Sequence, residues 1–199
     1  LVPPQPALWK DWPKVKPLPR VCVLVRTFEG QRSSLLSLVS SIAAGRPPNG
    51  ISIVLADTDL DRPFIGLREL AGQMSDLVFG DKTSVTVSDR TPSSGRSTFP
   101  RWKGDDYGYV QTDLVLEDMV HNRVLERANG VPEDTLPCEW TVVTNGDNLY
   151  HSAFFVALLS EAASQGADLV ASHFVSHYEW PGVTAGVPAW ENVRLRGKC

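Results

Sequence analysis

The amino-acid sequence predicts an α/β fold, in which a mainly parallel sheet is covered by helices on both faces as a three-layer α/β/α sandwich. Short apolar runs of strand length alternate with segments whose apolar residues recur at helical spacing. The connections between these segments are short and rich in turn-forming residues. This alternation is typical of strand–helix–strand units, which build parallel sheets.

The elements follow one another regularly along the chain. Residues 21–25 (VCVLV) form a continuous apolar run, as in a strand covered on both faces. Ser33 or Ser34 is expected to cap the following helix, and Gly45 is expected to end it. The further elements are expected in the order strand 51–56, helix 64–74, strand 84–88, helix 112–128, strand 139–144, helix 153–164 and strand 167–172.

Composition and charge limit the class of protein. The 199 residues are 42% hydrophobic and 21% charged, which is ordinary for a globular domain. The net charge of −4 disfavours nucleic-acid binding, which normally needs a basic face. No apolar run approaches the roughly 18–20 residues of a membrane span. The chain opens on Leu1 rather than Met, so we expect a processed or excised form, for which Golgi or ER lumen and cytoplasm all stay open.

The first twenty residues differ from the rest of the chain in composition. Residues 1–20 hold six of the 15 prolines, with Trp9 and Trp12 between them. This composition predicts an extended arm that packs its tryptophans on the domain or leads from an upstream linker. We expect residues 21–199 to form a single domain.

The three cysteines have no metal-ligand spacing and no CxxC pattern. Cys22 lies within an apolar run and Cys138 just before one, so both are expected to be buried thiols. Cys199 is terminal and is expected to stay unpaired or to pair with another molecule.

Polar and charged residues follow four of the predicted strands. Because the carboxyl ends of parallel strands share one edge of a sheet, where ligands bind, these residues are expected to gather there. Crowded carboxylates repel one another unless a cation lies among them. Mg²⁺ and Mn²⁺ suit such a place, because they prefer carboxylate oxygens and share their ligand shell with phosphates. The residues concerned are Arg26, Thr27, Asp57, Asp59, Asn145, Asp147, His173 and His177.

Three stretches in this order resemble a known family. VCVLVRTFEGQRSSLLSLVSSI, ISIVLADTD and CEWTVVTNGDNLY, the last followed by HSAFF, are similar to the GT-A glycosyltransferases, especially the large inverting group that contains cellulose and chitin synthases. The resemblance covers roughly residues 20–175. It implies a GT-A-like (Rossmann-like) fold. It also implies metal-dependent transfer of a sugar from a UDP- or GDP-linked donor to a hydroxyl of a glycan or protein acceptor.

The resemblance also implies roles for particular residues. Asp57 would contact the base or ribose, and Asp147 matches the last aspartate of the DxD motif, which ligates the Mn²⁺ or Mg²⁺ bridging the diphosphate. Asn145 stands where the family has the first aspartate of the motif, and it brings no charge. His173 or His177 would add a metal ligand. For the Asn145–Asp147 stretch a plain hairpin turn is the alternative.

Other candidates have weaker patterns. Arg26, with Thr27 beside it, would lie near a donor phosphate, or else would form a surface salt bridge. Asp59 is a donor contact or a turn former. Asp113 is a donor contact or an N-terminal carboxylate favoured by the helix dipole.

Inverting transfer needs a base that deprotonates the acceptor hydroxyl. Glu179 and Glu191 are the glutamates that follow the last predicted strand, and each lies beside a tryptophan. Retaining chemistry stays open, as does a domain truncated on its acceptor side. Two other classes also stay open. One is a non-catalytic nucleotide-sugar-binding domain, and the other a Mg²⁺-dependent phosphatase or hydrolase, although no nucleophile motif follows the first strand.

Overall fold

The computed structural model divides the chain into two compact units, Leu1–Ala153 and Phe154–Cys199. The residues that the structure describes are 9, 19–59, 62–78, 83–88, 109–120, 138–170, 174–175 and 184–185.

The first unit is built on a parallel sheet, as the alternating pattern predicts. Among the described residues the sheet has four strands, β1 (Val21–Thr27), β2 (Ile51–Asp57), β3 (Thr83–Val87) and β4 (Trp140–Asn145). They lie in the order β3-β2-β1-β4, and every neighbouring pair is parallel. The chain therefore steps outward from β1 to β3 and then returns to the other side of β1, which is the reversal of strand order that creates ligand sites in such sheets.

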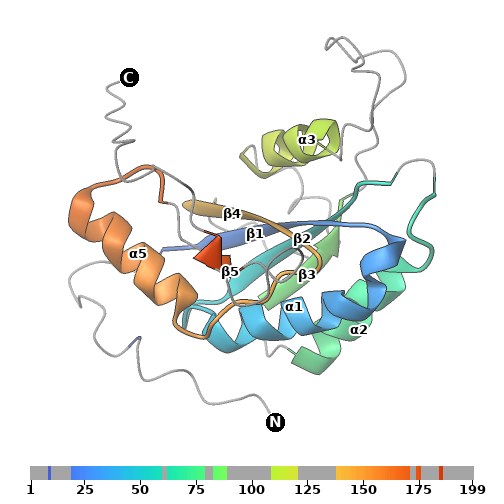
Figure 1. Cartoon of the computed structure of the whole chain (residues 1–199), viewed down its shortest axis with the longest axis horizontal. Coiled ribbons are helices and arrows are strands. Elements are labelled where there is room, and N and C mark those ends of the chain that lie inside the picture. Colours follow the sequence, from blue (N-terminus) through green and yellow to red (C-terminus); the bar gives the residue numbers. More distant parts are fainter. Residues whose placement is uncertain are drawn as a thin grey trace. The chain divides into compact units, whose positions relative to one another are not determined.

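Helices cover both faces of this sheet. A short 3-10 helix, η2 (Glu29–Gln31), leads into α1 (Arg32–Gly45), and α2 (Leu67–Val78) precedes β3. Figure 1 shows α1 and α2 on one face and α3 (Tyr109–Val120) on the other. The predicted three-layer arrangement is confirmed for this unit.

The core lies on both sides of β1 and β2, which explains their uninterrupted apolar sequences. Successive side chains of a strand point to opposite faces. The face toward α3 is a buried cluster of Cys22, Leu24, Val54, Ala56, Val115 and Met119. The other face is formed by Val21, Val23 and Val25 of β1, which are fully buried, as are Leu35, Leu38, Val39 and Ile42 of α1.

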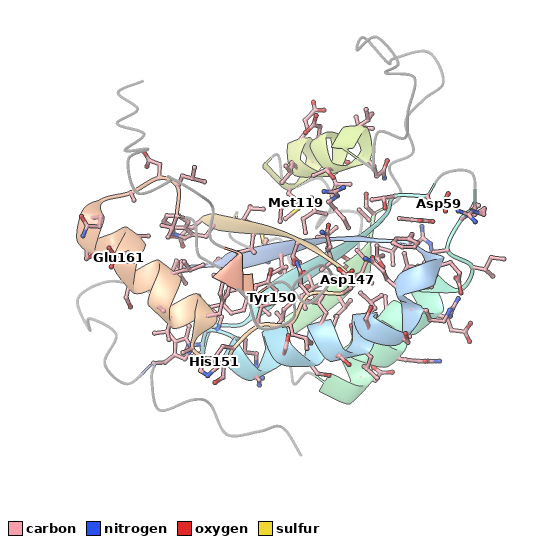
Figure 2. All side chains as sticks on the ribbon, in the orientation of Figure 1. Asp59, Met119, Asp147, Tyr150, His151 and Glu161 are labelled. Atoms are coloured by element: carbon pink, nitrogen blue, oxygen red, sulfur yellow. A yellow bond between two sulfur atoms is a disulfide. The ribbon has the colours of Figure 1, made fainter. Side chains whose placement is uncertain are left out.

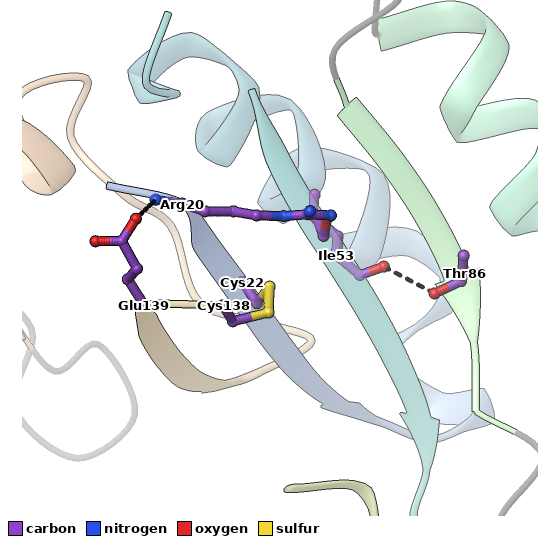
Figure 3. The surroundings of a disulfide bond; sticks show 7 residues. Arg20, Cys22, Ile53, Thr86, Cys138 and Glu139 are labelled. Atoms are coloured by element: carbon purple, nitrogen blue, oxygen red, sulfur yellow. Dashed lines mark hydrogen bonds between the residues drawn. A yellow bond between two sulfur atoms is a disulfide. The ribbon is translucent and has the colours of Figure 1, made fainter. Parts of the chain in front are cut away.

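The two predicted thiols are instead joined, so the prediction for Cys22 and Cys138 is wrong. They form a disulfide with a Cα–Cα distance of 5.7 Å, across a sequence separation of 116 residues (Figure 3). The reason is tertiary. Because β4 pairs with β1, Cys138, two residues before β4, comes within disulfide reach of Cys22, the second residue of β1. The same junction is held by the Arg20 amide, which donates to Glu139 Oε1 at 3.2 Å.

Several boundaries differ from the predicted ones. The N-cap of α1 is Gln31, without a side-chain capping bond among the described residues, so neither predicted serine caps the helix. The helix α3 begins three residues before the predicted start, and residues 121–128 lie outside the described ones. No strand forms over 167–170, the described part of the predicted strand 167–172.

The second unit contains α5 (Phe154–Gln165) and a short antiparallel pair, β5 (Phe174–Val175) with β6 (Thr184–Ala185). In the N-terminal arm, Trp9 is only 6% exposed, so this indole is buried. Within the described residues, no helix combines the length and the apolarity that crossing a membrane requires.

Candidate functional site

The ends of β2 and β4 flank the end of β1. In the register of the sheet, Thr27 lies opposite Asp57 and Arg26 lies opposite Asn145. The polar groups that the sequence places after these strands therefore share one edge, the carboxyl edge of the sheet. Figure 2 shows Asp59 and Asp147 toward this end of the molecule.

These side chains are divided between the two faces of the sheet. Register partners on adjacent strands point the same way, and successive residues point opposite ways. Arg26 and Asn145 therefore belong to the face that carries α3, whereas Thr27 and Asp57 belong to the face that carries α1 and α2. A ligand at this edge could be contacted from both layers.

The Asn145–Asn148 stretch is a tight turn at the end of a parallel strand. The Asn148 amide donates to Asn145 O at 3.2 Å, and the Gly146 amide donates to Arg26 O at 2.8 Å. Because β4 pairs with β1 in parallel, the alternative of a plain hairpin is wrong here. Asp147 is half-buried within the turn, and Asn145 is exposed.

A glycine is required at position 146 by the closeness of its neighbours. A Cβ atom there would lie 2.7 Å from Thr27 Oγ1 and 2.8 Å from Gln31 Oε1. Both oxygens are buried and have no hydrogen-bond partner among the described residues. The Gly146 carbonyl in turn accepts from Ser34 Oγ at 3.1 Å. The start of α1 therefore packs directly against the turn.

Hydrogen bonds of Thr144, Asn148 and Tyr150 hold the turn from the other side. Asn148 Nδ2 donates to Thr144 Oγ1 at 2.9 Å, and the Tyr150 hydroxyl hydrogen-bonds with the side chains of both residues. Burial raises the pKa of Tyr150, and the two hydrogen bonds oppose that rise. The Tyr150 amide donates to Ser41 Oγ of α1 at 3.1 Å (Figure 2 labels Tyr150).

Asp57 organises the segment that follows β2. Its Oδ1 accepts from the Asp59 amide at 3.2 Å, and its Oδ2 accepts from the Phe64 amide at 2.7 Å. A carboxylate has about four acceptor positions, so room remains for a donor on a ligand. Asp59 accepts from the Arg62 amide at 3.0 Å and pairs with Arg62 Nε at 3.3 Å, which is the turn-forming arrangement.

Two residues at this edge were missed by the sequence reasoning. The Arg32 guanidinium donates two hydrogen bonds to the Glu29 carboxylate, Nε to Oε1 at 2.6 Å and Nη2 to Oε2 at 2.8 Å. Its Cζ also lies over the Phe64 ring, 4.7 Å from the ring centroid. The i,i+3 spacing of Glu29 and Arg32 is the signal that could have found this pair. Phe28 directly follows β1, and its side chain is 40% exposed.

Asp113 lies away from the start of its helix. It is the fifth residue of α3, and the first turn of α3 has no acidic residue, so the interpretation as an N-terminal carboxylate is wrong. Its side chain is exposed, in contrast to those of Gln111 and Thr112, which are buried.

His173, His177, Glu179 and Glu191 lie outside the described residues. Within the described part of the chain, no group of three or more His, Cys, Asp or Glu side chains is arranged to hold a metal ion. At the turn the described residues supply one carboxylate, that of Asp147, and the side-chain amides of Asn145 and Asn148, of which Asn148 already bonds Thr144.

Comparison with known proteins adds little. No family model matches the chain, and no curated protein sequence matches it. A crystal structure of residues 1–349 of TarS from S. aureus is similar with a TM-score of 0.43 and 11% identity, over 75% of this chain. The matched part spans 34% of that chain, so about two thirds of it has no counterpart here. A similarity of this size decides neither fold nor function.

Proposed function

We propose that this chain binds the nucleoside diphosphate of a nucleotide sugar at the carboxyl edge of its sheet and transfers the sugar to a hydroxyl acceptor. One observation supports this above all. The register of β1 with β2 and β4 brings Asp57 and the Asn145–Asn148 turn to the two sides of the same strand end. This is where parallel sheets bind ligands, and it joins the two motifs that resemble glycosyltransferases.

The nucleoside is proposed to lie on the side of Asp57. The unused acceptor positions of that carboxylate suit an N–H of a base or a hydroxyl of ribose. The exposed ring of Phe28, one residue beyond β1, offers a face on which a base can stack. Arg26, on the other face of the sheet, would place a permanent positive charge near the phosphates.

A divalent cation is proposed at the turn. Asp147 and Asn145 would hold it together with diphosphate oxygens and water. Because the described residues offer only one carboxylate at the turn, these side chains suit a cation whose ligands come partly from the nucleotide, and not one bound by protein ligands alone. The ion would supply positive charge for the departing diphosphate. Because Asn145 is neutral, we expect weak metal affinity until the nucleotide is present.

The acceptor side of the proposal concerns residues outside the described part. Glu179 and Glu191 remain the candidates for the base of an inverting transfer. A non-catalytic binding domain is the second candidate, and the neutral Asn145 favours it. A hydrolase is disfavoured, because the residue that ends β1 is Thr27, whose side chain is fully buried and unavailable as a nucleophile.

The test is a thermal-shift panel of UDP-, GDP- and CMP-sugars, each with and without Mn²⁺. One nucleotide class is expected to raise the melting temperature only with metal. A ligand at a hundred times its Kd stabilises by about 2.7 kcal/mol, which corresponds to roughly 5–10 °C for a domain of this size. Asp147→Ala should abolish the shift, while Asp76→Ala, an exposed carboxylate of α2, should leave it intact.

Equal shifts in the wild type and Asp147→Ala would remove the metal role from Asp147. A metal-dependent shift without any sugar transfer would make the chain a binding domain. Glu179→Gln should keep the shift and lose transfer, and unchanged turnover would eliminate Glu179 as the base.

A further inference from the structure

We propose that Arg32 is a positioning residue that acts through Phe64 to hold the Asp57 carboxylate in place for the donor, an inference that rests on the proposed function. Arg32 begins α1, whereas Asp57 ends β2. The two are linked by the segment 58–66, whose described residues contact both of them.

The segment after β2 is fastened at three points. Next to the strand, the Thr58 amide and hydroxyl both donate to Thr27 O, at 2.8 and 3.1 Å. Asp57 itself then accepts the amides of Asp59 and Phe64. The third point is Arg32, whose Nη2 donates to the carbonyl of Ile65 and whose guanidinium lies over the Phe64 ring.

The contacts of Arg32 with Phe64 and Ile65 position the Phe64 amide that bonds Asp57. The Phe64 amide makes the shorter of the two bonds on Asp57, at 2.7 Å against 3.2 Å. Its position depends on where the Phe64 ring and the Ile65 carbonyl are held, and Arg32 contacts both. Without Arg32, Phe64 keeps its buried ring and the bond from the Leu67 amide to its carbonyl at 3.3 Å, but it loses the guanidinium contacts on its ring and on Ile65, so its bond to the Asp57 carboxylate weakens.

Replacement of Arg32 is expected to cost little stability. The side chains of Arg32 and Glu29 are 45% and 49% exposed, and ion pairs this exposed contribute little to stability. Lysine cannot replace the arginine, because the contacts need a planar fork that binds Glu29 with two nitrogens while it covers a ring. Arg32→Lys is therefore informative beside Arg32→Ala.

The first measurement is hydrogen exchange of single backbone amides by NMR in the full chain. We expect the Phe64 amide to exchange about tenfold faster in Arg32→Ala, as befits a weakened bond to a charged group, and Arg32→Lys to recover little of the protection. Amides of β1 should be unchanged. Arg46→Ala is the control, since Arg46 lies at the other end of α1 and its side chain donates to Ala43 O of the same helix at 2.9 Å.

The second measurement is the affinity for UDP and for GDP, each with Mn²⁺. We expect Kd to rise about tenfold in Arg32→Ala and Arg32→Lys, while turnover at saturating donor stays the same, because a misplaced Asp57 weakens binding and not the chemical step. Arg46→Ala should match the wild type.

The outcomes are distinct. Unchanged exchange at Phe64 overturns the link between Arg32 and Asp57, whatever the chain binds. Faster exchange with unchanged nucleotide affinity overturns the role toward the donor. A wild type that binds neither nucleotide overturns the proposed function, and the donor role of Arg32 with it, while the Phe64 amide still decides the structural link. If Arg32→Ala does not fold, Arg32→Lys carries both measurements.

Discussion

Reduction of the Cys22–Cys138 disulfide should cost this protein a large part of its stability. The bond joins residues 116 apart, so it closes a loop that contains α1, β2, α2, β3 and α3. In the chain-entropy view, a cross-link lowers the entropy of the unfolded chain by an amount that rises with the logarithm of loop length. For this loop the expected stabilisation is about 5 kcal/mol at 25 °C.

That free energy is large on the scale of a folded domain, whose unfolding free energy is typically about 5–15 kcal/mol. The melting temperature should fall by roughly 10–20 °C on reduction. Reduction of the wild type is the better perturbation. Cys22 is 1% exposed in the core facing α3, so Cys22→Ala would add the cost of a small cavity to the loss of the loop.

The assay is urea unfolding with and without reductant, in a Cys199→Ser background that prevents pairing between molecules. The Cys22→Ala/Cys138→Ala variant is the control, because its midpoint should not respond to reductant. A difference below about 1 kcal/mol between the oxidised and reduced forms would refute the loop-entropy reasoning. Disulfides persist in oxidising compartments. Among the Golgi or ER lumen and the cytoplasm, which the sequence leaves open, the Cys22–Cys138 disulfide therefore favours the lumen.

Two further predictions concern the turn after β4. Gly146→Ala should destabilise the unit by about 1–3 kcal/mol in urea unfolding, since the new methyl group meets Thr27 and Gln31. Gly72→Ala is the control, because a Cβ atom at Gly72 would have no neighbour within 4 Å, and it should stabilise α2 by about 0.5–1 kcal/mol. Equal effects of the two substitutions would contradict the close packing at Gly146. Burial raises the pKa of Tyr150 above its ordinary 10.0, so the unfolded chain loses this proton first and stability falls as pH rises beyond 10. Tyr150→Phe should remove that part of the alkaline loss, and an unchanged slope of stability against pH would count against it.

Local patterns carried most of the fold prediction. The strands β1 and β2 were visible because they are buried on both faces, which requires continuous apolar runs such as those at 21–25 and 51–56. The end of α1 was visible at Gly45. The start of α1 was not, because the helix already begins at Arg32, before both serines. The Ser34 hydroxyl faces Gln31 O and Gly146 O, the latter 112 residues away in sequence.

The candidate site was also predicted in part from local patterns. Parallel strands end at one edge, so Asp57 and Asp147 could be assigned to that edge from strand polarity alone. What occupies the acceptor positions of Asp57 could not be predicted, because its partners are backbone amides with no side-chain signature. Arg32 was missed because its importance comes from Phe64 and Ile65, which the sequence separates from it by more than thirty residues.

The sequence by itself determined the class of fold and the edge at which its polar groups gather, because strand length, helical spacing and strand direction are properties of neighbouring residues. Only the tertiary structure decided that β4 lies beside β1. That pairing joins Cys22 to Cys138, packs Gly146 against Thr27, and places the turn opposite Asp57. Strand order depends on how distant segments bury their apolar faces together, and no local pattern records it.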